Sequence, residues 1–201
     1  EITYGDWSSD VCSSDLAKVP RERFVPPAYA AVAYADTEIP LGGDDHMLAP
    51  KVAGRILQAV APQPTDRVLE VGTGSGYQAA VLSRLAREVV SVERYRTLAE
   101  TARTRLKTLG YGNVEVMHGD GLAGVPSRAP YDRIIVTAAA EAVPQALTGQ
   151  LAEGGVMILP LGPHHGAQDL VKLTKGADGL KRETLIAVRF VPLLPGQARE
   201  L

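Results

Sequence analysis

The sequence has very little cysteine or tryptophan. Among the 201 residues there is one cysteine, Cys12, and one tryptophan, Trp7. A single cysteine excludes a disulfide within the chain. Because Cys12 falls in the first sixteen residues, residues 17–201 have no thiol to offer for catalysis or for binding a metal.

A strong net charge and long apolar runs are also missing. The formal charge is −2 at pH 7, from 21 basic and 23 acidic residues, so nothing indicates a nucleic-acid or membrane-surface partner. No apolar run approaches the roughly 20 residues that a spanning helix needs, and no secretory signal pattern is present. We therefore expect a cytoplasmic protein, acting as a monomer, whose length fits one domain with a sizeable core.

Residues 1–16 differ in character from the rest of the chain. The segment Asp6–Leu16 resembles the conceptual translation of a common sequencing adapter. We expect residues 1–16 to be an assembly artefact, or otherwise a natural disordered tail rich in serine and aspartate. Both interpretations predict that this segment carries no function, and that the functional domain comprises residues 17–201.

The chain is organised around a short apolar run that ends in three alternating glycines. Residues 68–71 are typical of a buried strand, Gly72, Gly74 and Gly76 form a turn, and a helical pattern begins at Tyr77. Such a turn lets the backbone approach a ligand closely, and the helix that follows offers free N–H groups. The spacing differs from the G-x-G-x-x-G of dinucleotide-binding turns, which disfavours a nicotinamide-dependent oxidoreductase.

Two acidic residues stand near the ends of neighbouring predicted strands. Glu70 lies two residues before the first glycine, where a carboxylate would repel a pyrophosphate and would suit a ligand with a cationic or neutral tail. Glu93 closes the next apolar run, and a carboxylate there accepts hydrogen bonds from both hydroxyls of a ribose. The alternative is a tight strand–helix turn that binds nothing. Together the glycines and acids resemble the S-adenosylmethionine (AdoMet) signature of class I methyltransferases.

Strand-like and helix-like segments alternate along most of the chain, which indicates a mostly parallel sheet. The last two predicted strands, 169–175 and 184–193, are separated by a charged turn and favour an antiparallel edge. The predicted fold class is therefore α/β, a Rossmann-like doubly wound sheet with a C-terminal antiparallel edge. The other predicted elements are strands 88–93, 113–117, 131–137 and 156–161 and helices 77–86, 96–109 and 143–151.

From about Val19 to Leu194, the order of the motifs is similar to that of protein-L-isoaspartate O-methyltransferases. This family methylates the α-carboxylate of isoaspartyl residues in damaged protein, using AdoMet and no metal. The resemblance therefore implies protein repair, with isoaspartyl peptides or proteins as partners. The motifs that carry it are Arg23–Pro26, Val68–Tyr77, Glu93–Arg94, Gly119–Gly121, Ala129–Asp132, Ala138–Ala140, Gly154–Gly155, Leu159–Gly162 and Phe190–Leu193.

The resemblance also implies which residues bind AdoMet. The glycine turn would line the methionine moiety, Glu70 would orient that part of the turn, and Glu93 would hold the ribose. Asp120 would accept a hydrogen bond from the adenine amine; taken alone, Gly119–Gly121 would be an ordinary turn. The full predicted cofactor set is Ala49, Pro50, Glu70, Gly72, Thr73, Gly74, Ser75, Gly76, Glu93, Asp120 and Gly121.

One segment departs from the family pattern Thr-Ile-Ser-x-Pro, whose serine is assigned to the active site. Aligned on Pro50, this chain has His46 in place of the threonine and Leu48 in place of the serine. Leucine cannot donate a hydrogen bond to a carboxylate and would desolvate the anion. Asp44 and Asp45 would add repulsion if they face the cleft. The catalytic candidates are thus Leu48, expected to be inactive in the serine's role, and His46, which can partly replace the donor or is a solvated loop residue.

Three functions remain open on the sequence alone. The first is an active isoaspartyl methyltransferase. The second is a paralogue that methylates another small molecule or peptide in a pocket made more apolar by Leu48. The third is an AdoMet-binding module without catalysis. We expect no metal site, because the pair His164 and His165 has no cysteine or nearby acidic ligand and is typical of a surface loop.

Overall fold

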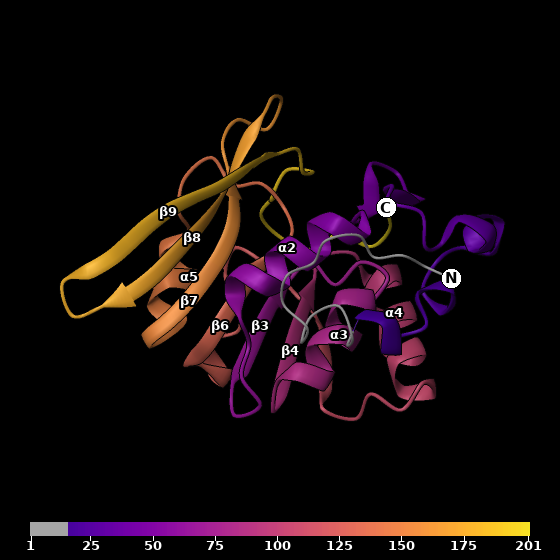
Figure 1. The fold of residues 1–201 in the computed structure, drawn as a ribbon, viewed down its shortest axis with the longest axis horizontal. Coiled ribbons are helices and arrows are strands. Elements are labelled where there is room, and N and C mark those ends of the chain that lie inside the picture. The colour runs from indigo at the N-terminus through magenta and orange to yellow at the C-terminus, as the bar shows by residue number, and fades with distance from the viewer. Residues whose placement is uncertain (1–15) are drawn as a thin grey trace.

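The computed structural model describes residues 16–201, and within them the chain forms a seven-stranded sheet in the order β5-β4-β3-β6-β7-β8-β9 (Figure 1). A separate two-stranded hairpin precedes it. The strands of the sheet are β3 (Arg67–Val71), β4 (Glu88–Glu93), β5 (Val114–His118), β6 (Tyr131–Val136), β7 (Leu151–Leu161), β8 (Gln168–Gly176) and β9 (Gly179–Val188). The hairpin strands are β1 (Ile39–Gly42) and β2 (Asp45–Met47). The described residues also form the α-helices α2 (Pro50–Val60), α3 (Tyr77–Leu85), α4 (Arg96–Thr108) and α5 (Gln145–Gln150).

The sheet is parallel from β5 to β7 and antiparallel from β7 to β9. This confirms the predicted α/β class with its C-terminal antiparallel edge. Parallel strands place all their carboxyl ends at one edge, so the turns that follow β3, β4 and β6 meet there. The C-terminal strands β8 and β9 continue the sheet beyond β7, on the side away from β6 (Figure 1).

Alternate residues of the central strands enter two separate cores. Val68 packs in the core that also holds buried residues of α2, α3 and α4, whereas Leu69 packs in the core that holds Leu147 of α5. Successive strand side chains point to opposite faces, and both faces of this sheet are covered. The three longer helices therefore lie on one face, and the short α5 lies on the other.

The last strand begins and ends earlier than the sequence predicts, whereas β8 extends the predicted strand 169–175 by one residue at each end. The strand predicted at 184–193 is β9 (Gly179–Val188), and most of the predicted charged turn is strand. β9 is an edge strand whose charged residues 181–183 are exposed, so they do not interrupt pairing with β8. Past β9 the chain crosses to the end of β6, where the N–H of Ala139 donates to the carbonyl of Val191 at 2.7 Å and that of Leu193 to the carbonyl of Ala139 at 2.8 Å.

The predicted artefactual tail falls almost entirely outside the described residues, which begin at Leu16. Leu16, assigned to that tail, is 1% exposed and packs in the core on the α2–α4 face. That residues 1–15 are an artefact or a tail without function stays a prediction. In the described part of the chain, none of the helices has the length and apolar character needed to cross a membrane.

Candidate functional site

A cavity of about 310 Å³ lies at the carboxyl ends of the parallel strands. Its walls come from the turn after β3, the end of β4, the residues that follow β6, and the β1–β2 hairpin. Residues 191–194 and Leu201 complete it. Open α/β sheets bind ligands at this edge, and the volume is at the lower end of the range for small-molecule pockets.

Gly72 is required by a close approach of the backbone to β6. Its φ is +96°, and an added Cβ would lie 2.3 Å from Oγ1 of Thr137. That hydroxyl donates to the carbonyl of Val71 at 3.0 Å, and the N–H of Gly72 donates to the carbonyl of Val92 at 2.9 Å. The turn is thus fixed to both neighbouring strands, and only glycine satisfies both the space and the backbone angle.

The third glycine has a packing role and not a lining role. Gly76 precedes α3 with φ +87°, and an added Cβ would meet Leu106 and Ala102 of α4 at 3.3–3.4 Å. The cavity is lined by the four turn residues 72–75, but not by Gly76. This position serves the contact between α3 and α4, and the contact of Gly76 with the ligand stays a prediction.

Glu93 ties the end of β4 to the glycine turn. It is 4% exposed yet lines the cavity. One carboxylate oxygen accepts the N–H of Gly74 at 3.0 Å, and the other accepts the N–H of Tyr95 at 3.0 Å. A carboxylate has about four lone-pair sites, so each oxygen keeps capacity for a further donor.

Glu70 lies beneath the turn, which it supports, and does not line the cavity; its direct contact with AdoMet stays a prediction. It is fully buried. Its Oε2 accepts a hydrogen bond from the hydroxyl of Ser91 at 2.5 Å, and that hydroxyl lies 2.6 Å from the hydroxyl of Thr73. Burial raises the pKa of Glu70 from its ordinary 4.5 to about 8, despite the Ser91 hydrogen bond. At neutral pH this group is largely an uncharged acid within a hydrogen-bonded support.

Asp120 contacts the backbone at two other positions, and its contact with an adenine stays a prediction. Its two oxygens accept the N–H groups of Leu122 at 2.9 Å and Gly196 at 2.8 Å, and it does not line the cavity. Gly121 does line it, and an added Cβ there would lie 2.5 Å from Val71. Asp120 thus holds the C-terminal segment in place while Gly121 keeps the cavity open.

The segment before α2 is the β1–β2 hairpin, in which Pro40 pairs with His46. Its residues bring His46 and Leu48 to the cavity as predicted. The carbonyl of Leu48 accepts a hydrogen bond from the buried guanidinium of Arg21 at 2.6 Å. Ala49 and Pro50 do not line the cavity: they cap and begin α2.

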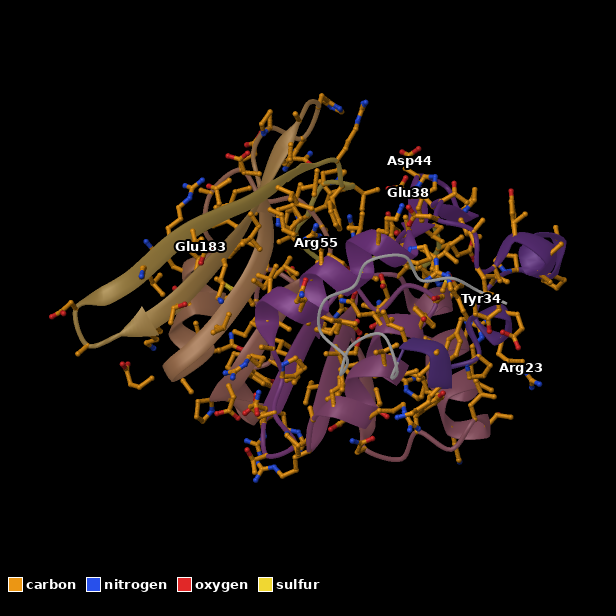
Figure 2. The ribbon with its side chains drawn as sticks, viewed as in Figure 1. Arg23, Tyr34, Glu38, Asp44, Arg55 and Glu183 are labelled. Atoms are coloured by element: carbon orange, nitrogen blue, oxygen red, sulfur yellow. The ribbon has the colours of Figure 1, made fainter. Side chains whose placement is uncertain are left out.

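Asp45 of the same hairpin also faces the cavity, as the sequence left open. Burial raises the pKa of its carboxyl from 3.8 to about 6, and repulsion from Glu93 adds to the shift. Asp44 lies at the exposed tip of the hairpin, at the cavity rim (Figure 2). The acidic side chains that line the cavity are thus Asp44, Asp45 and Glu93, and they outnumber the basic ones, Arg94 and His46.

Several lining residues were missed from the sequence. Thr137 and Ala138 follow β6 directly, and Arg94 and Tyr95 follow Glu93, so the rule that parallel strands end together would have found them. Tyr77 and Gln78 open α3 directly after the glycine turn. No comparable signal places Leu201. Over residues 16–201 no three or more His, Cys, Asp or Glu side chains are grouped to hold a metal ion. The lining residues absent from the predicted site are Tyr77, Gln78, Arg94, Tyr95, Thr137, Leu193 and Leu201, among others.

Comparisons with known proteins agree on one family. Residues 1–198 match the family described as Protein-L-isoaspartate(D-aspartate) O-methyltransferase (PCMT). A Protein-L-isoaspartate O-methyltransferase from Bradyrhizobium sp. (strain BTAi1) is 50% identical over 186 residues, 92% of this chain and 86% of that protein. A protein of the same name from Methanoregula boonei is 47% identical over 179 residues, 89% of this chain and 82% of its own.

Solved structures show the same fold. A protein-L-isoaspartate O-methyltransferase at 32% identity superposes with a TM-score of 0.81 over 92% of this chain, which spans 61% of that one. A Plasmodium falciparum PCMT in complex with S-adenosyl-L-homocysteine has a TM-score of 0.81 over 94% of this chain and 92% of its own, at 23% identity. With a family match along nearly the whole chain and relatives at half identity, this chain belongs to the protein-L-isoaspartate(D-aspartate) O-methyltransferase family.

Proposed function

We propose that this chain is a protein-L-isoaspartate O-methyltransferase, which moves a methyl group from AdoMet to the α-carboxylate of isoaspartyl residues in damaged protein. The observation that carries the proposal is sequence identity: over 92% of its length this chain is 50% identical to a protein of that name. Its cavity joins the glycine turn to the hairpin that stands where the family has its acceptor segment. We further propose that the acting unit is a monomer.

The cavity residues fit AdoMet. Gly72 and Gly121 let the backbone of the cavity wall approach Thr137 and Val71 more closely than a Cβ would allow, and Glu93 keeps lone pairs for the two ribose hydroxyls. AdoMet, when bound, supplies an electrophilic methyl group: a carboxylate oxygen bonds to this carbon while the carbon–sulfur bond breaks and its electron pair stays on sulfur. Leu48 and Met47 form an apolar wall beside the acceptor and exclude water from it.

The chemistry asks mainly for positioning. An acceptor α-carboxyl group has an ordinary pKa of about 3.5 and is already ionised at neutral pH, so no general base is required. Holding that carboxylate in line with the methyl group can contribute several kcal/mol to the lowering of the barrier. The residues that line the acceptor end of the cavity therefore act by binding and orienting.

A methyl-transfer assay with paired peptides tests the proposal. Radiolabelled AdoMet is supplied with an isoaspartyl peptide and with its aspartyl twin, and base-labile label is counted together with AdoMet binding by calorimetry. We expect label only in the isoaspartyl peptide. AdoMet binding without transfer to that peptide would reject the proposed acceptor and leave a binding module or a different acceptor.

Replacing Leu48 with serine should strengthen acceptor binding. The Leu48→Ser variant adds a hydroxyl at a position that lines the cavity, and a hydrogen bond to a charged group is worth about 1.5–3 kcal/mol. We expect the KM for the isoaspartyl peptide to fall about tenfold, with an unchanged AdoMet Kd. Leu48→Ala is the control, because it opens the same space without a donor. A serine variant no better than the alanine variant would contradict our interpretation of Leu48.

A further inference from the structure

Outside the glycine turn, the acceptor end of the cavity has a shortage of hydrogen-bond donors. Leu48 occupies the position of the family serine, and its neighbour Met47 is also apolar. On the hairpin the polar side chains that line the cavity are Asp44, Asp45 and His46. An anionic acceptor that enters here loses water and needs a donor in return. If the acceptor is a carboxylate, a hairpin side chain can supply this donor beside Arg94 and Tyr95, which also line the cavity.

Asp45 has the geometry for that contact. It lies at the closing end of the hairpin, paired with Gly42, and it is half-buried in the cavity wall. Its Oδ1 accepts the N–H of His46 at 3.0 Å. Its Oδ2 receives no hydrogen bond from the described residues 16–201, so this oxygen is available to a ligand in the cavity. A carboxylic acid can donate from such an oxygen, whereas a carboxylate can only accept.

The charges around Asp45 favour its acid form. Glu93, at the end of β4, repels a negative charge on Asp45, and His46, on the hairpin itself, attracts one. Asp44 and Arg94 are the other charged side chains that line the same cavity. The C-terminal segment brings the apolar side chain of Leu201 against Gly43. Burial dominates, and with Glu93 it raises the pKa of the Asp45 carboxyl to about 6.

We propose that Asp45, as the uncharged acid, donates a hydrogen bond from Oδ2 to the acceptor carboxylate and so takes the place of the missing serine hydroxyl. This inference rests on the proposed function and names the acceptor-binding residue of that site. The methyl transfer itself leaves the proton on Asp45, since the acceptor oxygen bonds to carbon and the carbon–sulfur electron pair stays on sulfur. When ionised, Asp45 instead repels the acceptor.

The proposal makes acceptor binding strengthen as the pH falls from neutral. With a pKa of about 6, the acid form of Asp45 grows about 25-fold between pH 7.5 and pH 5.5. Over that range the acceptor carboxyl, with an ordinary pKa of about 3.5, stays ionised. The expected result is an acceptor Kd that falls about 20-fold from pH 7.5 to 5.5.

The test measures binding and turnover separately. A fluorescent isoaspartyl peptide with blocked termini and no histidine is titrated into the protein saturated with S-adenosyl-L-homocysteine, at pH 5.5 and 7.5, by anisotropy. The methyl-transfer KM is measured in parallel. Asp45→Asn keeps a donor of the same shape without a charge, so it should bind at pH 7.5 as tightly as the parent does at 5.5, with no pH dependence. Asp45→Ala should bind weakly at both values.

Two further variants make the outcome decisive. Glu38→Gln changes an exposed carboxyl on the segment leading into the hairpin, outside the cavity lining (Figure 2), and should keep the parental pH dependence. His46→Asn should also keep it. A flat profile in His46→Asn together with a parental profile in Asp45→Asn would assign the effect to His46 and overturn the proposal, as would a parent that shows no pH dependence. If binding depends on pH in the expected way but no methyl is transferred, the role of Asp45 in acceptor binding is supported and the proposed function is rejected.

Discussion

Replacing Gly72 with alanine should abolish methyl transfer by weakening AdoMet binding at least 100-fold. The added Cβ would lie 2.3 Å from Oγ1 of Thr137, a separation that non-bonded atoms do not tolerate. The threonine cannot rotate away cheaply, because its hydroxyl donates to the carbonyls of Val71 and Gly72 at 3.0 and 3.1 Å. The turn must therefore shift, and the shift moves the backbone into the space that the methionine part of AdoMet would occupy. Calorimetric titration of purified Gly72→Ala with AdoMet measures the loss.

Gly110→Ala separates this steric effect from backbone strain. Gly110 follows α4 with φ +85°, close to the +96° of Gly72, but an added Cβ there would have no atom within 4 Å. Alanine at either position is strained by its positive φ and should cost about 1 kcal/mol of unfolding free energy. Only Gly72→Ala should lose AdoMet affinity. Equal AdoMet affinities for the two variants, both folded by circular dichroism, would contradict the assignment of the glycine turn.

The fold was predictable because its signals are local. Apolar runs of five or six residues and the glycine turn fixed β3, β4 and β6, whose bounds match the prediction to within one residue. The β1–β2 hairpin was not predictable, because it pairs three residues on each side and includes Pro40 and Gly42, which are typical of loops. The predicted bounds of β9 were wrong because its exposed charged residues 181–183 resemble a turn. These residues form a strand only because they pair with β8.

The site was predictable where it depends on residues adjacent in the sequence. It was not predictable where it depends on side-chain direction or on contacts between distant segments. Gly72, Gly74 and Glu93, which the sequence predicts to bind AdoMet, line the cavity. Glu70 and Asp120 do not, because a motif gives the residue type but not the direction in which its side chain points. Asp120 instead binds Gly196, 76 residues away, a contact that no pattern of spacing reveals.

Raising the pH should destabilise the parent protein through Glu70, and Glu70→Gln should remove that effect. Its pKa is raised from 4.5 to about 8 by burial, so the folded state keeps a proton that the unfolded chain releases above pH 4.5. Unfolding therefore releases a proton between these two values, and stability is full below about pH 4.5 and falls as pH rises toward 8. Between pH 5.5 and 8 the parent should lose about 3 kcal/mol more than Glu70→Gln. Urea unfolding at both values measures the difference.

Glu100→Gln supplies the control, since it removes an exposed carboxyl on α4 and should keep the parental loss. Glutamine at position 70 retains an oxygen that accepts the Ser91 hydroxyl, which holds the Thr73 hydroxyl beneath the turn. AdoMet affinity at pH 7 should therefore stay within about twofold of the parent. If Glu70 acted as an anion that attracts the cationic part of AdoMet, the same variant would lose affinity about tenfold or more. A loss of that size, with no change in the pH dependence of stability, would show that the acid is charged and reaches the ligand.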